Sequence, residues 1–587
     1  MTSPLVDSDG IVNLRVAVEG AELPEEYQVL QVRVQLGLRS VGRCTLTFVD
    51  ENYAVVGSGK LNIGKAVSVS AGYGDLLGTV FEGTVTSATS EVDGYRGATL
   101  TVVVQDGGYE LLRDTDVESF TNVSLRDIVT RLVQAAGLSL GTVDLPTAPV
   151  KYALRNDTAL GLIDEIAQRT GRDWCISGRT FSMWPAATGS APGARPVEIV
   201  VGRDVIAFSA RQVGDGDTKV TVRGWDPVAQ SPVVGTSTTP TSRAGFDVGS
   251  RGAPTYTRVD ARAATRSQSD ATVAAAAIAA RTGRVVATGK VQYTALMVPG
   301  GRVIVGGAGP SNGNYYVREI TNTWMDGNAI TRFVAGDRDP VQLSDPWETT
   351  SPVSSFRRSG LAVGIVDNVK DPDGMGRVSV SLATASDQAT TTWARVLGLG
   401  AGAGRGQVVL PEVGDEVLIG FEDDDVTRPV VLGGLYGNKS TTPTAAVDQN
   451  GAVITRALTS RLGHVLEMSD GTAPATQHVL LAAAGLKHSL RIGKDRADLK
   501  VPDGVPLKIA AGSSFIEFDG KGGITIDATT VTIKAKAKVE TSATEVTTTA
   551  SGALKLQGTQ ASLKGTGMGV VEAGGILEVK GAMVKIN

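Results

Sequence analysis

The last segment of the chain, residues 496–587, carries a short internal repeat. Apolar residues recur there every seven to nine positions, at Leu499, Leu507, Ile516, Ile524, Val531, Val539, Val546, Leu554, Ala561, Val570, Leu577 and Val584. In many of these pieces the residue two positions later is also apolar, as at Ile526, Ile533, Leu556, Leu563, Val579 and Ile586. Because side chains along a strand alternate between two faces, the spacing predicts short strands separated by sharp corners, as in a β-helix or prism.

Two arrangements are compatible with this repeat. Three successive pieces could form one coil of roughly 22 residues, as in a β-solenoid made by a single chain. Three chains could instead wind together, each supplying one face of every layer. With a rise of about 4.8 Å per piece, the intertwined form would be a needle of roughly 50–60 Å, and its backbone hydrogen bonds would run largely between chains. The periodicity alone does not separate the two.

A second dense region of strand patterns covers residues 361–436. Short β-like runs follow one another closely there, at 363–366, 377–382, 393–396, 407–410, 416–421 and 429–432. Parallel strands need crossovers of about a dozen residues, so the close spacing predicts an antiparallel arrangement. Closure into a small barrel would remove the exposed edges.

The rest of the chain alternates between β and helical patterns. Residues 1–108 and 195–336 read mainly as β-strands, and 109–194 as a compact α+β insert. Cap and stop residues predict three helices: Ser124 to Gly137 with Asp127 as the capping acid, Thr158 to Gly171, and an Ala-rich helix at 270–281 capped by Ser269 and ended by Gly283.

Composition argues against several classes of protein. The 587 residues carry a net charge of −5 and no basic block, which disfavours a nucleic-acid partner. The two cysteines, Cys44 and Cys175, lie in separate β-like runs, so buried thiols are favoured over a disulfide. The N-terminus has no signal-peptide pattern and no apolar run is long enough to cross a membrane, so we expect synthesis and assembly in the cytoplasm.

Motifs for catalysis, cofactors and metals are weak in this sequence. The glycines from Gly398 to Gly406 repeat every second residue and do not fit a dinucleotide fingerprint. The turn at 371–376 resembles a calcium loop, but Leu382 stands where a bidentate glutamate is needed. His464, His478 and His488 form no zinc motif, although one histidine from each chain of a trimer could form a ring. We therefore expect no catalytic, cofactor-binding or metal-binding residues.

Several local motifs carry a family resemblance. Those in the small barrel are Asp371-Pro-Asp-Gly-Met-Gly-Arg-Val, Trp393-Ala-Arg-Val, Pro411-Glu-Val-Gly-Asp-Glu-Val-Leu-Ile-Gly-Phe-Glu and Arg428-Pro-Val-Val-Leu-Gly. Weaker ones are Phe81-Glu-Gly-Thr-Val, the helix at Asp127 to Val129 and Gly224-Trp-Asp-Pro. Two more are Arg461-Leu-Gly-His-Val-Leu-Glu and Met583-Val-Lys-Ile-Asn. With the order of the segments, they resemble the VgrG-like spike proteins of contractile injection systems, in which a phage late-control hub protein is fused to a needle.

The resemblance implies a mainly β fold with a trimeric needle. Its expected segments are hub β-barrel 1 (1–108), an α+β insert (109–194), hub β-barrel 2 (195–336), a linker (337–358), an OB-fold (359–438), a connector (439–495) and an intertwined triple-stranded β-helix (496–587). The tube-like barrels, two in each chain, would match a hexameric inner tube.

The resemblance also implies roles for particular residues. The structural residues of the OB-fold would be Trp393, Arg395, Pro411, Gly414, Asp415, Gly420, Phe421, Pro429 and Gly433. We expect Trp393 to plug one barrel end and Pro411 to start a strand. Arg428 would pair with Glu422 or the acids at 423–425, unless these acids form a solvated turn. The needle end would dock a tip protein through Ala582, Val584 and Ile586.

The implied function is structural, not enzymatic. The expected partners are two further copies of the chain, an inner tube protein, other baseplate proteins and a PAAR-type tip protein, with transient contact with a target membrane. The particle would assemble in the cytoplasm and be delivered or released outside the cell. A polysaccharide-cleaving or polysaccharide-binding tail spike is the alternative, and the lack of aromatic residues after Phe518 argues against the cleaving form.

Overall fold

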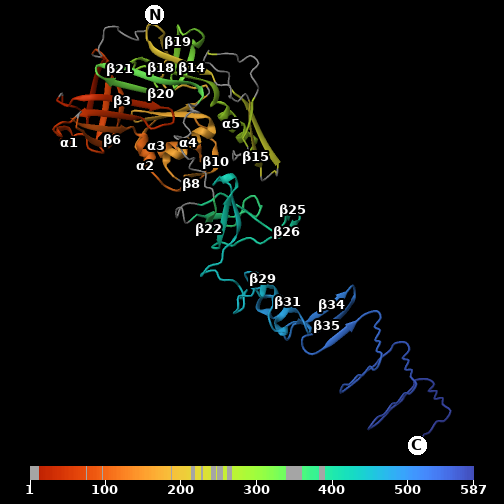
Figure 1. Cartoon of the computed structure of the whole chain (residues 1–587). Helices are drawn as coiled ribbons and strands as arrows, with labels where there is room; N and C mark the ends of the chain where they lie inside the picture. Colours follow the sequence, from red (N-terminus) through yellow and green to blue (C-terminus); the bar gives the residue numbers. More distant parts are fainter. Residues whose placement is uncertain are drawn as a thin grey trace. The chain divides into compact units, whose positions relative to one another are not determined.

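A computed structural model gives the structure of the chain. It describes residues 12–586 except 25, 75, 95–96, 156, 187, 213–218, 227–228, 230, 240–245, 247–255, 261–266, 339–359 and 383–389. The expected linker therefore lies almost wholly outside the described residues. The chain is mainly β (Figure 1) and divides into two compact units, residues 1–441 and 442–587, which are taken in turn.

One large sheet organises the first unit. Its thirteen strands are β1 (Val12–Val18), β2 (Ala21–Glu22), β3 (Val29–Gly37), β4 (Arg43–Val49), β5 (Ala66–Tyr73), β6 (Leu76–Asp93), β7 (Gly97–Gln105), β13 (Val197–Val200), β14 (Val205–Gln212), β18 (Thr282–Gln292), β19 (Arg302–Gly306), β20 (Gly313–Met325) and β21 (Asn328–Arg338). The main path runs β14-β18-β21-β20-β3-β4-β7-β6-β5-β1-β2, with β13 and β19 joined to it through β20. The β20–β3 pair thus unites the two segments expected to form hub barrels.

Each half of this sheet covers its own apolar core. The first core includes Val32, Leu46 and Phe48, and the second includes Val303, Tyr315 and Phe333. The alternation of buried and exposed residues along β3, β4 and β7 follows the period of two in the sequence. The short helix α1 (Ala54–Gly57) lies between β4 and β5 in the first half. The 3-10 turn η1 (Gly309–Ser311) lies between β19 and β20 in the second half.

The insert contains the two helices that the cap residues predict. They are α3 (Leu125–Ala135) and α4 (Ala159–Thr170), which follow the short α2 (Gly108–Arg113). The Ser124 and Thr158 hydroxyls accept the N–H groups of Asp127 and Gly161 at 3.1 and 2.9 Å, which confirms both caps. Two small sheets complete the insert, formed by β8 (Glu118–Ser124) with β10 (Pro149–Arg155) and by β9 (Ser139–Val143), β11 (Arg172–Ser177) and β12 (Thr180–Pro185).

The third helix begins and ends earlier than predicted. Helix α5 spans Gln268–Ala279, and its cap is Ser267, whose hydroxyl accepts the N–H of Asp270 at 3.1 Å. The predicted cap Ser269 is wrong because it already lies inside the helix, and the predicted stop Gly283 lies in β18. Helix α5 packs on a small sheet of β15 (Lys219–Asp226), β16 (Ser231–Thr238) and β17 (Thr257–Asp260).

Residues 361–436 form a small five-stranded barrel. Its strands are β22 (Ala362–Asn368), β23 (Ser379–Ser381), β24 (Arg395–Val396), β27 (Glu416–Phe421) and β28 (Pro429–Gly434), in the order β23-β22-β27-β28-β24. A bridge between Val378 and Ala394 joins the two ends of this order and closes the sheet. The pairing is antiparallel except between β24 and β28, which corrects the all-antiparallel prediction.

A further strand expected in this barrel is absent. Residues 407–410 have no regular structure; the neighbouring chain forms only the two-residue strands β25 (Ala401–Gly402) and β26 (Arg405–Gly406). The strand pattern alone was insufficient, because none of the strands that the structure describes pairs with this segment, and Val408 remains 85% exposed. The barrel also contains the 3-10 turn η2 (Glu422–Asp424).

The second unit consists of two single-layer antiparallel sheets. The first contains β29 (Thr455–Thr459), β30 (Val465–Asp470), β31 (Gln477–Ala482), β32 (Ser489–Gly493) and β33 (Ala497–Lys500), with the 3-10 turns η3 (Pro474–Thr476) and η4 (Ala484–Leu486) between strands. The second contains β34 (Leu507–Ala511), β35 (Ser514–Phe518) and β36 (Ile524–Asp527). Residues 528–586 form no helix or strand within the chain, so the predicted strands there are not formed by one copy alone.

Candidate functional site

The first turn of the small barrel is held by one carboxylate. Asp371 accepts the backbone N–H groups of Asp373, Met375 and Arg377 at 3.0, 2.8 and 3.2 Å. The Arg377 guanidinium adds a contact of 2.5 Å, and it holds the pKa of Asp371 well below its usual range. The turn that resembled a calcium loop is thus closed by its own donors, with the Asp371 carboxylate committed to N–H groups.

A buried arginine organises the acidic turn between β27 and β28. Arg428 is only 6% exposed and lies 2.7 Å from the Asp423 carboxylate and 3.3 Å from that of Glu422. Glu422 also pairs with Arg395. The solvated-turn alternative is therefore wrong for Arg428, and pairing with Glu422 and Asp423 is confirmed. The turn places Asp423 at φ 56°, a left-handed conformation that aspartate tolerates better than most residues.

The same turn contacts the α+β insert. Val426 is buried in the core of the insert, next to helix α4 residues, and the Arg169 guanidinium lies 3.3 Å from the Asp425 carboxylate. Glu165, one turn earlier on α4, lies 2.7 Å from Arg169. Burial raises the pKa of Glu165 to about 7, with Asp425 adding to the rise and Arg169 opposing it. The hydroxyl of Tyr152 also donates to the Thr390 carbonyl at 2.8 Å.

The structure places the nine predicted motif residues in different roles. Gly414 and Asp415 form the turn before β27: Gly414 has φ 95° and donates to the Val366 carbonyl, and the Asp415 carboxylate accepts the N–H of Glu412. Gly420 and Pro429 lie in paired strands, and Gly433 is opposite Leu418 next to a bulge. These residues thus lie in turns and paired strands of the barrel, and their role as structural residues of an OB-fold stays a prediction.

Three motif residues differ from the prediction or extend it. Trp393 is half-buried just before β24, and its neighbour Ala394 is fully buried in the barrel core. That Trp393 plugs one end of the barrel stays a prediction. Pro411 does not start a strand but lies in irregular chain five residues before β27. Phe421 packs against both the barrel core and the insert core, a dual contact that the sequence did not indicate.

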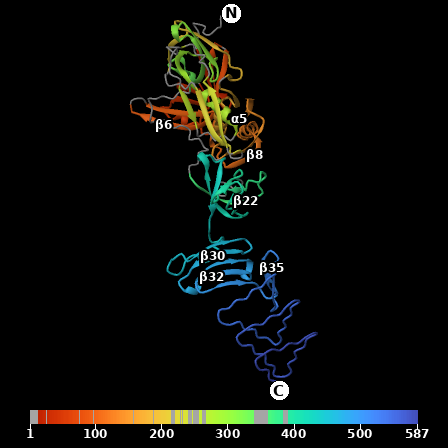
Figure 2. The same cartoon turned by 90° about the vertical axis from the view of Figure 1, so that its right-hand side faces the viewer.

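The five-stranded sheet of the second unit has one apolar face. Two rows of cross-strand neighbours build this face: Leu458, Leu466, Leu481, Leu490 and Leu499, and Arg456, Met468, Val479, Ile492 and Ala497. Its side chains are largely exposed within one copy; Leu481, for example, is 57% exposed. The opposite face carries Glu467, His478 and Arg491, with His478 3.2 Å from Glu467. Figure 2 shows β30 and β32 in this single layer.

The sheet of β34, β35 and β36 also has two apolar rows. Leu507, Phe518 and Ile524 are cross-strand neighbours, and so are Ile509, Ile516 and Ile526. Beyond Asp527 the apolar repeat residues are exposed, including the predicted docking residues Ala582, Val584 and Ile586. Tip docking at these three residues stays a prediction.

Buried carboxylates in the first unit are features that sequence reasoning missed. Asp106 accepts the N–H groups of Gly42 and Gly108 at 2.7 and 2.8 Å, and burial raises its pKa to about 7. Asp173 is 1% exposed and accepts the Tyr316 hydroxyl at 3.1 Å. Both acids lie beside strand ends, and only contacts with distant segments bury them, so the sequence offered no signal for either.

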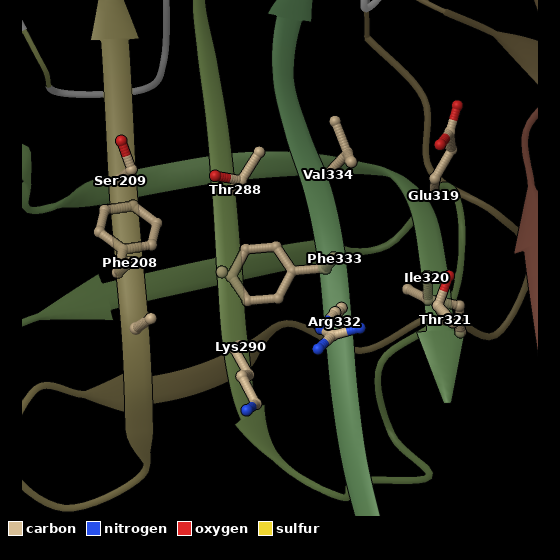
Figure 3. Close-up of a pocket in the computed structure, with 12 residues that line it drawn as sticks. Phe208, Ser209, Thr288, Lys290, Glu319, Ile320, Thr321, Arg332, Phe333 and Val334 are labelled. Atoms are coloured by element: carbon tan, nitrogen blue, oxygen red, sulfur yellow. The ribbon is translucent and has the colours of Figure 1, made fainter. Parts of the chain in front are cut away.

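One pocket of about 440 Å³ lies over strands β14, β18, β20 and β21. Figure 3 shows Phe208 and Phe333 around it, with Lys290, Arg332 and Glu319 on its rim. Gly289 leaves room for the Phe333 ring, because a Cβ at this glycine would lie 2.2 Å from that ring. None of the twelve lining residues is a histidine or cysteine, and we assign the pocket no chemical role.

The part of the chain that the structure describes contains no group of three or more His, Cys, Asp or Glu side chains arranged for a metal ion. His464, one of the three histidines, accepts the N–H of Ala484 through Nδ1 at 3.0 Å. No helix among the described residues is long and apolar enough to cross a membrane. The two cysteines, Cys44 and Cys175, are free thiols.

Two family models match the chain. One, described as the Type VI secretion system/phage-baseplate injector OB domain, matches residues 362–436 and so coincides with the small barrel. The other, the Alg8 N-terminal domain, matches residues 8–326, which is more than half of the chain.

Curated relatives are similar over short stretches. The Type VI secretion system spike protein VgrG3 of Vibrio cholerae is 27% identical over 115 residues, which are 19% of this chain and 11% of that protein. The Type VI secretion system spike protein VgrG5 of Pseudomonas aeruginosa is 30% identical over 102 residues, 17% of this chain and 13% of that protein. The alignments thus span little more than a tenth of either relative.

Solved structures of similar proteins extend over more of the chain. The E. coli c3393 protein, a type VI secretion component described as similar to the T4 tail proteins gp27 and gp5, is 13% identical with a TM-score of 0.46, covering 72% of this chain and 99% of that one. A half-lidded Francisella PdpA–VgrG complex is 9% identical with a TM-score of 0.45, covering 89% of this chain and 88% of that one.

Proposed function

The chain belongs to the VgrG-like spike proteins of contractile injection systems, and we propose that it acts as a homotrimeric central spike. It contains a match to the Alg8 N-terminal domain, followed by a baseplate injector OB domain. Its relatives are structural spike proteins. In this proposal the N-terminal part caps the inner tube at the baseplate, and the C-terminal part forms the needle that punctures a target envelope. The protein contributes stiffness and shape and catalyses no reaction.

The observation that carries this proposal is the apolar face of the second unit. Single-layer sheets normally bury one face against another layer, and large exposed apolar patches mark interaction sites. The face at β29–β33 has ten residues in two rows, of which nine are apolar. Three copies placed around one axis would turn these faces inward and cover them, while Glu467, His478 and Arg491 would remain in solvent.

The needle segment supports the same arrangement. Residues 528–586 keep the apolar repeat but form no strands within one copy. Backbone N–H and C=O groups need partners, and neighbouring copies would supply them in an intertwined β-helix. A coil closed by one chain would instead show strand pairs inside the copy. The segment boundaries predicted from the sequence form part of this proposal.

The small barrel serves as a connector in this proposal. It packs on the insert through Val426 and Phe421, and it carries exposed apolar side chains at Leu397, Leu399 and Val408 that other copies could cover. The proposed partners of the assembled spike are the inner tube protein, other baseplate proteins and a PAAR-type tip protein at Ala582, Val584 and Ile586. Assembly would occur in the cytoplasm, with delivery outside the cell on firing or lysis.

Native mass measurement tests the trimer directly. The full chain is expected at three times its 60.7 kDa mass. The substitution Leu481→Glu places a charge on the apolar face and should convert trimer to monomer, because an unpaired charge is costly to bury. The matched control Leu480→Glu lies on the other face, next to Glu467 and Arg491, and should keep the trimer. A wild-type monomer, or equal effects of both substitutions, would contradict the proposal.

A further inference from the structure

Three lysines, Lys534, Lys536 and Lys538, occupy one short piece of the repeat segment and are here called the lysine row. Apolar residues alternate with them, at Ile533, Ala535, Ala537 and Val539. Because successive side chains of an extended chain point to opposite faces, the lysines share one face and the apolar residues share the other. All three lysines are exposed within one copy, and the Lys538 side chain is 70% exposed. In the proposed needle the apolar face turns inwards, so the lysine row points to solvent.

The rest of the second unit is electrically balanced. Residues 442–533 contain nine Lys or Arg and nine Asp or Glu, and residues 539–587 contain four Lys and four Glu. The net charge of +3 in this unit therefore equals the charge of the lysine row alone. With the whole chain at −5 and this unit at +3, residues 1–441 carry −8. The lysine row is thus a local basic feature of an acidic protein.

Acidic side chains of the same copy compensate the lysine row only in part. Lys538 lies 2.6 Å from Glu540, but neither Lys534 nor Lys536 forms an ion pair among the residues that the structure describes. Lysines two positions apart on an extended chain are about 7 Å from each other, within the screening length of about 8 Å at physiological salt, so they repel. Threonine would give a polar surface without this repulsion, as at residues 547–549. The repeated positive charge therefore indicates an anionic partner.

Nucleic acid suits this surface less well than a lipid bilayer does. Proteins that bind DNA or RNA use arginines for hydrogen bonds with fixed geometry and aromatic side chains for stacking on bases. In the sequence no arginine follows Arg496 and no aromatic residue follows Phe518. A lysine ammonium group is a point charge that requires no fixed geometry of its partner, which suits the mobile headgroups of a bilayer.

We infer that the lysine row is a binding site for the anionic headgroups of a lipid bilayer. In three copies it becomes a belt of nine lysines at one height of the needle, because threefold symmetry keeps equivalent residues level. Headgroup phosphates form a dense plane, so one bilayer meets several lysines at once, and each lysine near an anionic surface strengthens binding about fivefold. The inference rests on the proposed spike and names the chemistry of the surface that its needle contacts.

The position of the belt along the needle fits the thickness of a bilayer. Seven repeats separate Val531, in the piece that carries the lysine row, from Val584 near the end of the sequence. At about 4.8 Å for each repeat, they span about 34 Å. The hydrocarbon core of a bilayer is about 30 Å thick. When the end of the needle has just crossed that core, the belt therefore lies at the headgroups on the side of entry.

Flotation of the full-length protein with lipid vesicles tests the inference. The wild type should float with vesicles of equal parts phosphatidylcholine and phosphatidylglycerol but not with phosphatidylcholine alone, and binding should weaken as salt is raised. The variant Lys534→Gln/Lys536→Gln/Lys538→Gln should bind the anionic vesicles about a hundredfold more weakly, because the three lysines of one copy meet the bilayer together. The variant Lys534→Arg/Lys536→Arg/Lys538→Arg keeps the charge and should retain binding.

The matched control removes the same charge elsewhere in the second unit. Lys494→Gln/Lys500→Gln/Lys521→Gln replaces three exposed lysines that lie in the balanced stretch before the lysine row. This variant should bind anionic vesicles as the wild type does. Equal weakening by both glutamine variants would mean that only net charge matters, and it would overturn the lysine row as the site.

The outcomes separate this inference from the proposed function. A wild type with the native mass of a trimer but no preference for anionic vesicles would overturn the inference and leave the spike proposal intact. Displacement from the vesicles by inorganic phosphate at an equal phosphate concentration would overturn the bilayer as the partner, and so would tighter binding to double-stranded DNA. A monomeric native mass would contradict the spike and, with it, the belt of nine lysines.

Discussion

The buried acid Glu165 predicts how the contact between the insert and the small barrel responds to pH. Its Oε1 lies 2.7 Å from Arg169, its Oε2 has no hydrogen-bond partner, and Asp164 and Asp425 are the nearby acids that raise its pKa. The substitution Glu165→Gln keeps the size of the side chain and removes its ability to ionise. It therefore isolates the free energy of burying this charge.

The sign follows from the raised pKa. Folding raises the pKa of Glu165 from its ordinary value of 4.5 to about 7, so the folded state holds the proton more tightly than the unfolded state. Stability from this group is present at pH 4.5 and falls as the pH rises towards 7. The shift corresponds to about 3 kcal/mol as an upper figure, at 1.36 kcal/mol per pH unit. The side chain is 11% exposed, so solvent screening reduces this figure little.

Thermal unfolding of wild type and Glu165→Gln at pH 5 and pH 8 provides the assay. At pH 5 the acid is neutral in the folded state and only begins to ionise in the unfolded state, so the two proteins should differ little in unfolding temperature. At pH 8 the variant should unfold a few degrees higher, because about 3 kcal/mol shifts Tm by several degrees in a domain of this class. The comparison between the two proteins also cancels the titration of Asp106, whose pKa is likewise raised to about 7.

The control for this experiment is Glu51→Gln, since Glu51 is exposed. It should track wild type at both pH values. An equal difference between wild type and Glu165→Gln at pH 5 and pH 8, or a variant that is less stable at pH 8, would refute the reasoning. The latter result would mean that the Arg169 ion pair outweighs the cost of burial.

Two further substitutions test packing in the first unit. Arg428→Met should lower the free energy of unfolding by about 1–3 kcal/mol in urea titrations, because Glu422 and Asp423 lose their shared buried cation. No loss of stability would mean that the Arg428 ion pairs contribute nothing net, with Glu422 still paired with Arg395. Gly235→Ala should lower Tm and loosen helix α5, because a Cβ at this position would lie 2.1 Å from the Ala271 backbone. The control Gly78→Ala should be nearly neutral, because a Cβ there meets nothing within 4 Å. Equal effects of the two substitutions on Tm would argue against the close approach of α5 to β16.

Local signals in the sequence predicted the helices of the insert well. A cap hydroxyl and the N–H that it satisfies are three residues apart, as with Ser124 and Asp127, so their geometry is contained in the sequence itself. The same logic failed at α5 because two serines, Ser267 and Ser269, were both available, and only the entering backbone conformation selects Ser267. The 407–410 segment failed for a related reason: a strand also requires a partner, which no local pattern supplies.

The sequence by itself determined the period of the repeat at residues 496–587, the alternation of the strands in the first unit and the turn chemistry of the small barrel, because each depends on residues close together in the chain. The tertiary structure decided which distant segments meet. It joined β20 to β3, buried Arg428 among its acids and raised the pKa of Glu165 by packing α4 against the barrel turn. It also showed that the repeat at 496–587 stays largely without strand partners in a single copy, since hydrogen bonds between strands depend on a neighbour that the order of residues does not specify.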